Sequence, residues 1–199
     1  MQDKELIAKI SKNNDNSAFN ELINRHKDNV FSIAIGFLHD KDAANDIVQD
    51  VFLKFWEIRK DFKLTAKFST WLYRVTVNKC INVQRKNKFS TVFSTFENKN
   101  NNENDISFEA QIPDNQQNTI GNKDKQNILK KNLKNALNSL PKRQKIAFIL
   151  NKYQNLSYKE IADVMELSIS SVEALLYRAK ANLQKKLYKT YENLKNNRL

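Results

Sequence analysis

Basic and aromatic side chains are interleaved between Asp61 and Glu97, a stretch that contains no acidic residue. Aromatic residues at positions 62, 68, 71 and 73 lie among its cations, which are Lys63, Lys67, Arg74, Lys79, Arg85, Lys86 and Lys88. Cations that follow a nucleic-acid backbone, together with rings on which unpaired bases stack, are what single-strand binding requires. The stretch therefore predicts contact with an opened nucleic-acid strand, with Phe68 and Trp71 expected to pack between helices instead.

Residues 156–180 have the pattern of a helix-turn-helix. Ser157 can cap a short first helix, Glu166-Leu167-Ser168 forms a tight connection, and a second short helix follows. Such connections usually carry glycine because one position needs positive φ, and a non-glycine residue such as Glu166 costs about 1 kcal/mol there. The outward face of the second helix can reach base edges in the major groove, while lysines meet phosphates. The predicted contacts are Lys159, Ser170, Ser171, Glu173, Ala174, Tyr177, Arg178 and Lys180.

Glu173 has two interpretations, and both remain open at this point. Its carboxylate can accept a hydrogen bond from the exocyclic amine of cytosine in the major groove. Alternatively, it can form an intrahelical ion pair with a nearby basic residue such as Arg178.

Asp42, Asp46 and Asp50 recur every four residues and form an acidic ridge on one helix face, with Gln49 beside them. Like charges at this spacing slightly destabilise an isolated helix. The ridge is therefore a candidate binding surface for a basic protein partner. The alternative is an acidic helix face that contacts only water.

The remaining composition argues against an enzyme. His26, His39 and Cys80 stand alone, and a chain with two glycines has no glycine-rich phosphate loop. We therefore expect no catalytic residue, no metal and no cofactor. The charged N-terminus, the single cysteine and the lack of an apolar run long enough to span a bilayer predict a cytoplasmic protein. The net charge of +12 is divided as +5 over residues 1–93, −4 over 94–119 and +11 over 120–199, which indicates a polyanion contacted at two places.

Two glycines and two prolines in 199 residues favour an all-helical fold, since sheets need frequent turn residues. Apolar residues recur at helical spacing from 18 to 88, with Asp40 or Asp42 and Ser69 or Thr70 as expected helix caps. The spacing returns at about residue 123, where an apolar stripe consists of Leu129, Leu133, Ala136, Leu137 and Leu140. We predict two small helical domains, 1–90 and 123–199, joined by a flexible acidic linker over 91–122.

Residues 42–56 and 68–78 closely resemble region 2 of the sigma-70 family. The C-terminal half, including Leu140-Pro141 ahead of a helix, resembles region 4 of the same family. Neither half leaves room for the family's region 1.1 or region 3, which is the layout of its extracytoplasmic-function group. The resemblance implies a region 2 helical bundle and a region 4 helix-turn-helix.

The resemblance further implies an RNA polymerase sigma factor, which directs core polymerase to promoters and assists strand opening. The clamp coiled coil of the polymerase would bind Asp46, Gln49 and Asp50. The minus-10 element would be read by Lys63, Lys67, Arg74, Asn78, Lys79, Asn82 and Arg85, and the minus-35 element by the second helix of the helix-turn-helix. The implied partners are core RNA polymerase, promoter DNA and an anti-sigma factor, which can be membrane-anchored.

The alternative function is a helix-turn-helix regulator of the response-regulator or quorum type. Such a protein needs an α/β receiver or a ligand pocket ahead of the motif. A helical, glycine-poor N-terminal half disfavours it.

Overall fold

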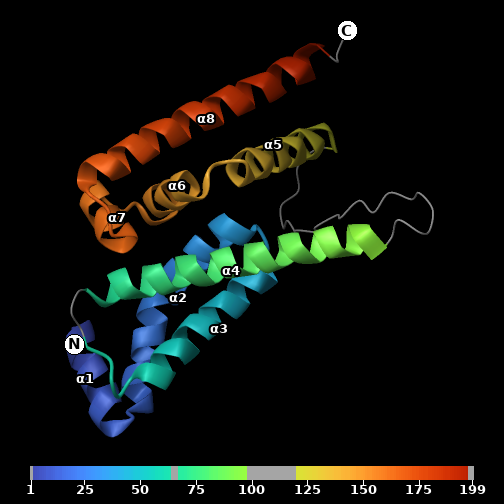
Figure 1. The fold of residues 1–199 in the computed structure, drawn as a ribbon. Helices are drawn as coiled ribbons and strands as arrows, with labels where there is room; N and C mark the ends of the chain where they lie inside the picture. The colour runs from blue at the N-terminus through green and yellow to red at the C-terminus, as the bar shows by residue number, and fades with distance from the viewer. Residues whose placement is uncertain (1, 64–66, 98–119, 197–199) are drawn as a thin grey trace. The chain divides into compact units, whose positions relative to one another are not determined.

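The structure, a computed structural model, describes residues 2–63, 67–97 and 120–196, with side chains over 2–63, 67–86 and 127–188. In this part of the chain every regular element is a helix, so the prediction of an all-helical fold is confirmed (Figure 1). The helices are α1 (Asp3–Asn13), α2 (Asn16–Leu38), α3 (Lys41–Ile58), α4 (Phe68–Glu97), α5 (Ile120–Asn138), α6 (Lys142–Gln154), α7 (Tyr158–Met165) and α8 (Ile169–Asn196).

The chain divides into two compact units, Met1–Glu109 and Ala110–Leu199. Helix α4 continues to Glu97 and α5 begins at Ile120, so both ends of the stretch predicted as a linker are helical. The extension of α4 is understandable because residues 68–97 contain neither glycine nor proline to end it. Residues 98–119, the middle of the predicted linker, lie outside the described residues.

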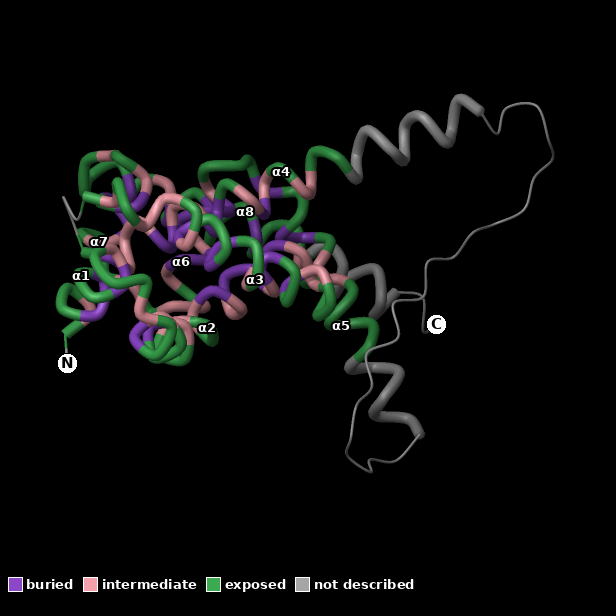
Figure 2. Tube along the Cα trace, turned by 90° about the horizontal axis from the view of Figure 1, so that it is seen from below, coloured by how far each residue is buried: buried purple, intermediate pink, exposed green. Residues whose placement is uncertain are grey.

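Unit 1 is built around α2, which packs against α1, α3 and α4. Helix α2 buries Leu22, Val30, Ile33, Ala34 and Phe37. Each helix buries one stripe and leaves the opposite side in water, and buried and exposed segments accordingly alternate along the trace in Figure 2. Helix α1 was not expected from the sequence; it buries Leu6, Ile7 and Ile10.

Short polar contacts fix where the helices of unit 1 begin. The Asp40 carboxylate accepts from the amide of Ala43 at 2.8 Å, so the predicted cap of α3 is Asp40 and not Asp42. The expectation that Ser69 or Thr70 caps the next helix is wrong. Helix α4 already includes Phe68, and the Thr70 amide donates to the Lys67 carbonyl at 3.0 Å, which leaves both hydroxyl residues inside the first turn.

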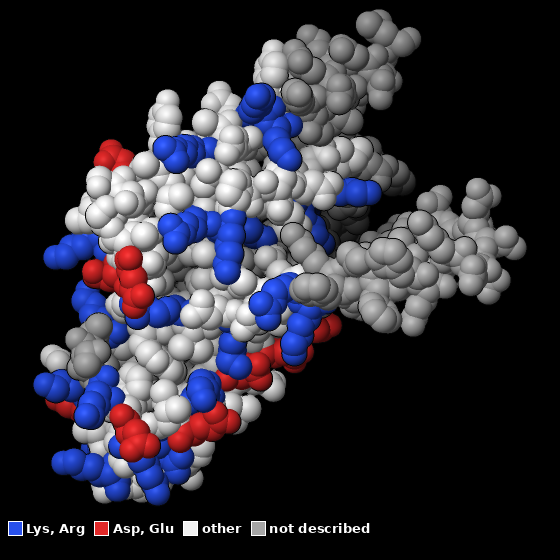
Figure 3. All heavy atoms as spheres, in the orientation of Figure 1, with Lys and Arg blue, Asp and Glu red and all other residues white. Residues whose placement is uncertain are grey.

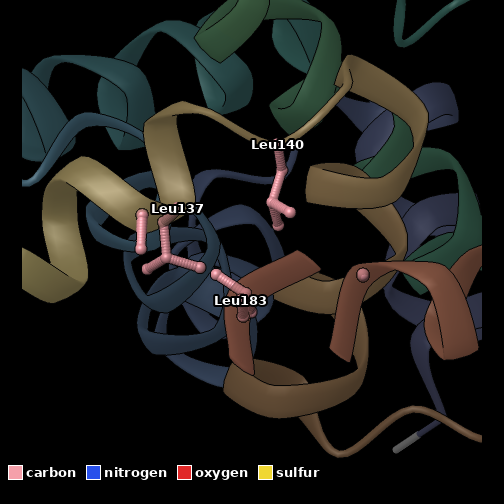
Figure 4. Close-up of a cluster of buried hydrophobic side chains, with 5 residues drawn as sticks. Leu137, Leu140 and Leu183 are labelled. Atoms are coloured by element: carbon pink, nitrogen blue, oxygen red, sulfur yellow. The ribbon is translucent and has the colours of Figure 1, made fainter. Parts of the chain in front are cut away.

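Unit 2 has its own core, in which Leu137 of α5 and Leu140, just after that helix, converge on Leu183 of α8 (Figure 4). Ala136 and Ala179 complete this cluster, with Phe148 and Leu187 packed against it. The predicted apolar stripe on α5 is only half buried. Leu129 and Leu133 are 62% and 42% exposed, whereas the three later members are buried, so α5 meets α8 through its C-terminal part.

Candidate nucleic-acid interface

Helix α3 separates an apolar side from a polar one. It buries Ala44, Ile47, Val51, Phe52 and Phe55. All four members of the predicted ridge, Asp42, Asp46, Gln49 and Asp50, are exposed. Figure 3 shows Asp and Glu side chains gathered in a band along α3, beside Lys and Arg side chains over α4. The ridge is therefore accessible to a basic partner.

Leu53 is a feature of this ridge that the sequence reasoning overlooked. It lies three residues after Asp50 and four after Gln49, which puts it on the same helix face, and it is 57% exposed. The spacing of Leu53 after Gln49 and Asp50 in the sequence was sufficient to predict that it lies on this face. An exposed apolar side chain among acidic ones suits a protein partner, since interfaces combine an apolar centre with a polar rim.

Asp50 and Lys79, predicted for two different partners, meet in the structure. The Lys79 Nζ donates to the Asp50 Oδ2 at 2.9 Å across the contact between α3 and α4. Lys79 is therefore held against the acidic ridge, apart from the other predicted minus-10 residues.

Those other residues share one side of α4. Lys67, directly ahead of the helix, is followed by Arg74, Asn78, Asn82 and Arg85 at intervals of seven, four, four and three residues, which places them along one face of α4. Lys67, Asn78, Asn82 and Arg85 are exposed, and Arg74 is half-buried. Lys63 is exposed ahead of the helix. We refer to Lys67, Arg74, Asn78, Asn82 and Arg85 as the α4 cationic face; it is suited to following a phosphate backbone.

The aromatic residues at positions 62, 68, 71 and 73 contribute to the core more than to the surface. Phe68 and Tyr73 are buried, and the rings of Phe62 and Trp71 lie 5.1 Å apart by their centroids, edge to face. Phe55 of α3 contacts both of these rings and Phe68 as well. The expected packing of Phe68 and Trp71 between helices is confirmed, and the suggestion that Tyr73 stacks on bases is wrong because its ring is buried.

The helix-turn-helix in unit 2 has the predicted connection. Ser157 caps α7 in a reciprocal capping box with Glu160, whose carboxylate accepts from the Ser157 amide at 3.1 Å. Glu166 has φ 55° and ψ 49°, the left-handed conformation that the sequence argument assigned to this position. The Ser168 hydroxyl accepts from the Ser171 amide at 3.2 Å and so starts the next helix.

That next helix, α8, is not short. It runs for 28 residues, with neither glycine nor proline to interrupt it between 169 and 196, so only its first turns can carry the predicted base contacts. Val172, Leu176 and Ala179 are buried, which turns the predicted contact residues outward. Exposed on α8 are Ser170, Ser171, Glu173, Ala174, Tyr177, Arg178 and Lys180, and Lys159 is exposed on α7. Among the large hydrophobic side chains that the structure describes, Tyr177 is the most exposed, at 76%.

Two of these exposed side chains are not held by the protein. In the part of the chain that the structure describes, neither Glu173 nor Arg178 forms a hydrogen bond or an ion pair. The intrahelical pair between them, one of two interpretations of Glu173, is thus absent from the structure. Both side chains are available to an outside partner. Burial raises the pKa of the half-buried Tyr153 hydroxyl above its ordinary value.

Neither a metal-ligand cluster nor a membrane-spanning helix occurs among the described residues. They contain no cluster of three or more His, Cys, Asp or Glu side chains that could hold a metal ion. None of the described helices is long and apolar enough to cross a membrane.

Family descriptions match both units. Residues 22–90 match Sigma-70 region 2, and residues 130–183 match Sigma-70, region 4. The first match covers the ridge and the α4 cationic face, and the second covers the helix-turn-helix. Both regions expected from the resemblance are thereby confirmed, and the response-regulator alternative is not favoured.

Curated relatives are similar along almost the whole chain. The RNA polymerase sigma-H factor of Pseudomonas aeruginosa is 25% identical, over 94% of each chain. The ECF RNA polymerase sigma-E factor of Escherichia coli is 27% identical, over 94% of this chain and 95% of its own.

Two solved structures share the fold. CnrH, in complex with the cytosolic domain of CnrY, has a TM-score of 0.66 at 22% identity and covers 94% of this chain and 97% of its own. The sigma factor RpoE of Bartonella quintana, in complex with the anti-sigma factor NepR, has a TM-score of 0.60 at 23% identity and covers 85% of this chain and 96% of its own.

Proposed function

This chain belongs to the sigma-70 family as an RNA polymerase sigma factor of the extracytoplasmic-function group. We propose that its two units bind different partners during transcription initiation. Unit 1 binds core polymerase and the opened minus-10 element. Unit 2 binds the duplex minus-35 element. The observation that carries this division is the pair of exposed, chemically opposite faces on α3 and α4 of one small unit.

The polymerase contact is assigned to Asp46, Gln49 and Asp50. They are exposed on α3, and a face of this charge fits a basic helix of the polymerase clamp. Leu53 adds an apolar group within the same face.

The minus-10 contact is assigned to Lys63, Lys79 and the α4 cationic face. Because most of the nearby rings are packed in the core, phosphate and polar contacts carry this interaction more than stacking on Phe68, Trp71 or Tyr73. The asparagines at 78 and 82 offer both donors and acceptors to unpaired bases.

The minus-35 contact is assigned to the first turns of α8 and to the lysines near them. Ser170, Ser171, Glu173, Ala174, Tyr177 and Arg178 face outward at the end of the helix that such motifs insert in the major groove. Lys159 and Lys180 meet phosphates, which add affinity without sequence preference.

An anti-sigma factor is the further partner of the proposal. The structurally similar CnrH and RpoE are bound to CnrY and NepR, the latter an anti-sigma factor. A sigma factor acts where core polymerase and the chromosome are, so we propose a cytoplasmic site of action and regulation by an anti-sigma factor, which can be anchored in the membrane. The role is one of DNA binding at initiation, not of catalysis.

The proposal predicts that the free chain binds duplex promoter DNA weakly and that tight, specific binding requires core polymerase. The reason is that the minus-10 face contacts separated strands, which the free chain has no means of opening. Gel-mobility titrations with a promoter duplex at physiological salt, with and without core polymerase, measure the difference. Nanomolar, sequence-specific binding of the duplex by the chain alone would contradict the proposal.

A further inference from the structure

We propose that Asp50 is shared between two partners, so that core polymerase, by engaging Asp50, releases Lys79 to bind a DNA phosphate. This inference rests on the proposed function, because it assumes that the α3 ridge binds polymerase and that α4 faces DNA. It deepens that function by joining the two faces through one ion pair.

The first support is the position of the pair. Lys79 follows Asn78 directly, so its side chain leaves α4 about 100° around the helix from the cationic face. It points across to α3, where its Nζ lies 2.9 Å from the Asp50 carboxylate. Lys79 is therefore a cation at the edge of the DNA-facing side, turned away from it by an acidic residue of the polymerase-facing side.

The second support is the accessibility of both ends. The Lys79 side chain is 29% exposed and that of Asp50 is 57% exposed, so solvent and a partner can reach the pair. Exposed pairs of this kind are weak, and a competing cation can replace one member: breaking such a pair shifts an equilibrium by no more than about fivefold. The coupling between the two partners is reciprocal. The factor by which polymerase binding releases Lys79 equals the factor by which removal of Lys79 raises the affinity for polymerase.

A second ion pair of the same kind elsewhere in the chain provides a control for the test. Lys54 donates to Glu57 at 3.3 Å, and both residues lie on α3. Neutralising Glu57 removes the same charge and frees the same kind of cation, but not at the edge of the α4 cationic face. Glu57→Gln is therefore the control for Asp50→Asn.

The first test measures binding of a fluorescent single-stranded oligonucleotide of mixed sequence to the free full-length chain, by anisotropy over a series of salt concentrations. Asp50→Asn should tighten binding by about two- to fivefold and steepen the salt dependence by about 0.7, the value for one added phosphate contact on a single strand. The additional affinity for the oligonucleotide should be lost in Asp50→Asn/Lys79→Gln. This double variant should then differ from the wild type only by the small change that Glu57→Gln also produces. Equal gains for Asp50→Asn with and without Lys79, or for Glu57→Gln, would overturn the inference.

The second test measures the affinity of core polymerase for the chain. Lys79→Gln should raise it by about two- to fivefold, since Asp50 then has no internal competitor. An unchanged or lower affinity would overturn the inference even if the wild-type chain binds core normally. If the wild-type chain fails to bind core at all, the proposed function fails, and the oligonucleotide test still decides whether Asp50 restrains Lys79.

Discussion

Reversing Asp46 and Asp50 to lysine abolishes association with core polymerase and leaves the helical fold intact. Both carboxylates are exposed on α3, so the substitutions disturb no buried contact. The change replaces two attractions to a basic partner with two repulsions, and like charges brought together in an interface cost several kcal/mol. Loss of the Lys79 ion pair adds little, because exposed pairs contribute only about 0–1 kcal/mol to stability.

Co-purification with tagged core polymerase measures the association, and circular dichroism with thermal unfolding monitors the fold. A double reversal of Asp28 and Asp61, which are exposed outside the ridge, is the matched control for net charge. It should keep binding near the wild-type level. Recovery of Asp46→Lys/Asp50→Lys with core at wild-type yield would remove the polymerase-binding role from α3.

Replacing Glu173 with alanine relaxes the minus-35 preference at one base pair by about 1–3 kcal/mol. Glu173 is exposed in the second turn of α8, and no protein group in the described residues holds its carboxylate. A carboxylate is repelled by phosphates but accepts a hydrogen bond from the exocyclic amine of cytosine. Its removal therefore affects which base is preferred more than how strongly DNA is bound.

Transcription from a library of promoters with randomised minus-35 sequences measures this effect. Arg178→Ala is the comparison, since loss of a phosphate contact weakens all sequences about equally and leaves their ranking unchanged. A minus-35 profile identical to that of the wild type for Glu173→Ala would eliminate the base contact.

Local patterns made most of unit 2 predictable. The cap at Ser157, the positive φ of Glu166 and the outward face of α8 follow from residues within about two turns of one another, where helical geometry alone decides which side chains coincide. The motif predicts a short second helix, which is wrong: α8 runs for 28 residues, and neither glycine nor proline interrupts it.

Contacts between distant segments were not predictable from these patterns. Lys79 and Asp50 are separated by 29 positions, and their pairing depends on how α4 crosses α3. The same reason explains Tyr73: composition shows aromatic rings among cations, but the packing of the helices in unit 1 decides that the Tyr73 ring is buried. The exposure of Leu129 and Leu133 likewise reflects where α8 meets α5, which the apolar stripe on α5 alone does not reveal.

Run-off transcription with purified core polymerase from the bacterium that encodes the chain tests the central claim most directly. Core alone should yield no promoter-specific transcript from a library of genomic fragments. Addition of the chain should produce discrete transcripts whose start sites share minus-10 and minus-35 elements, and Asp46→Lys/Asp50→Lys should not produce them. Transcripts that are unchanged by adding the folded wild-type chain would contradict the assignment of this protein as an initiation factor.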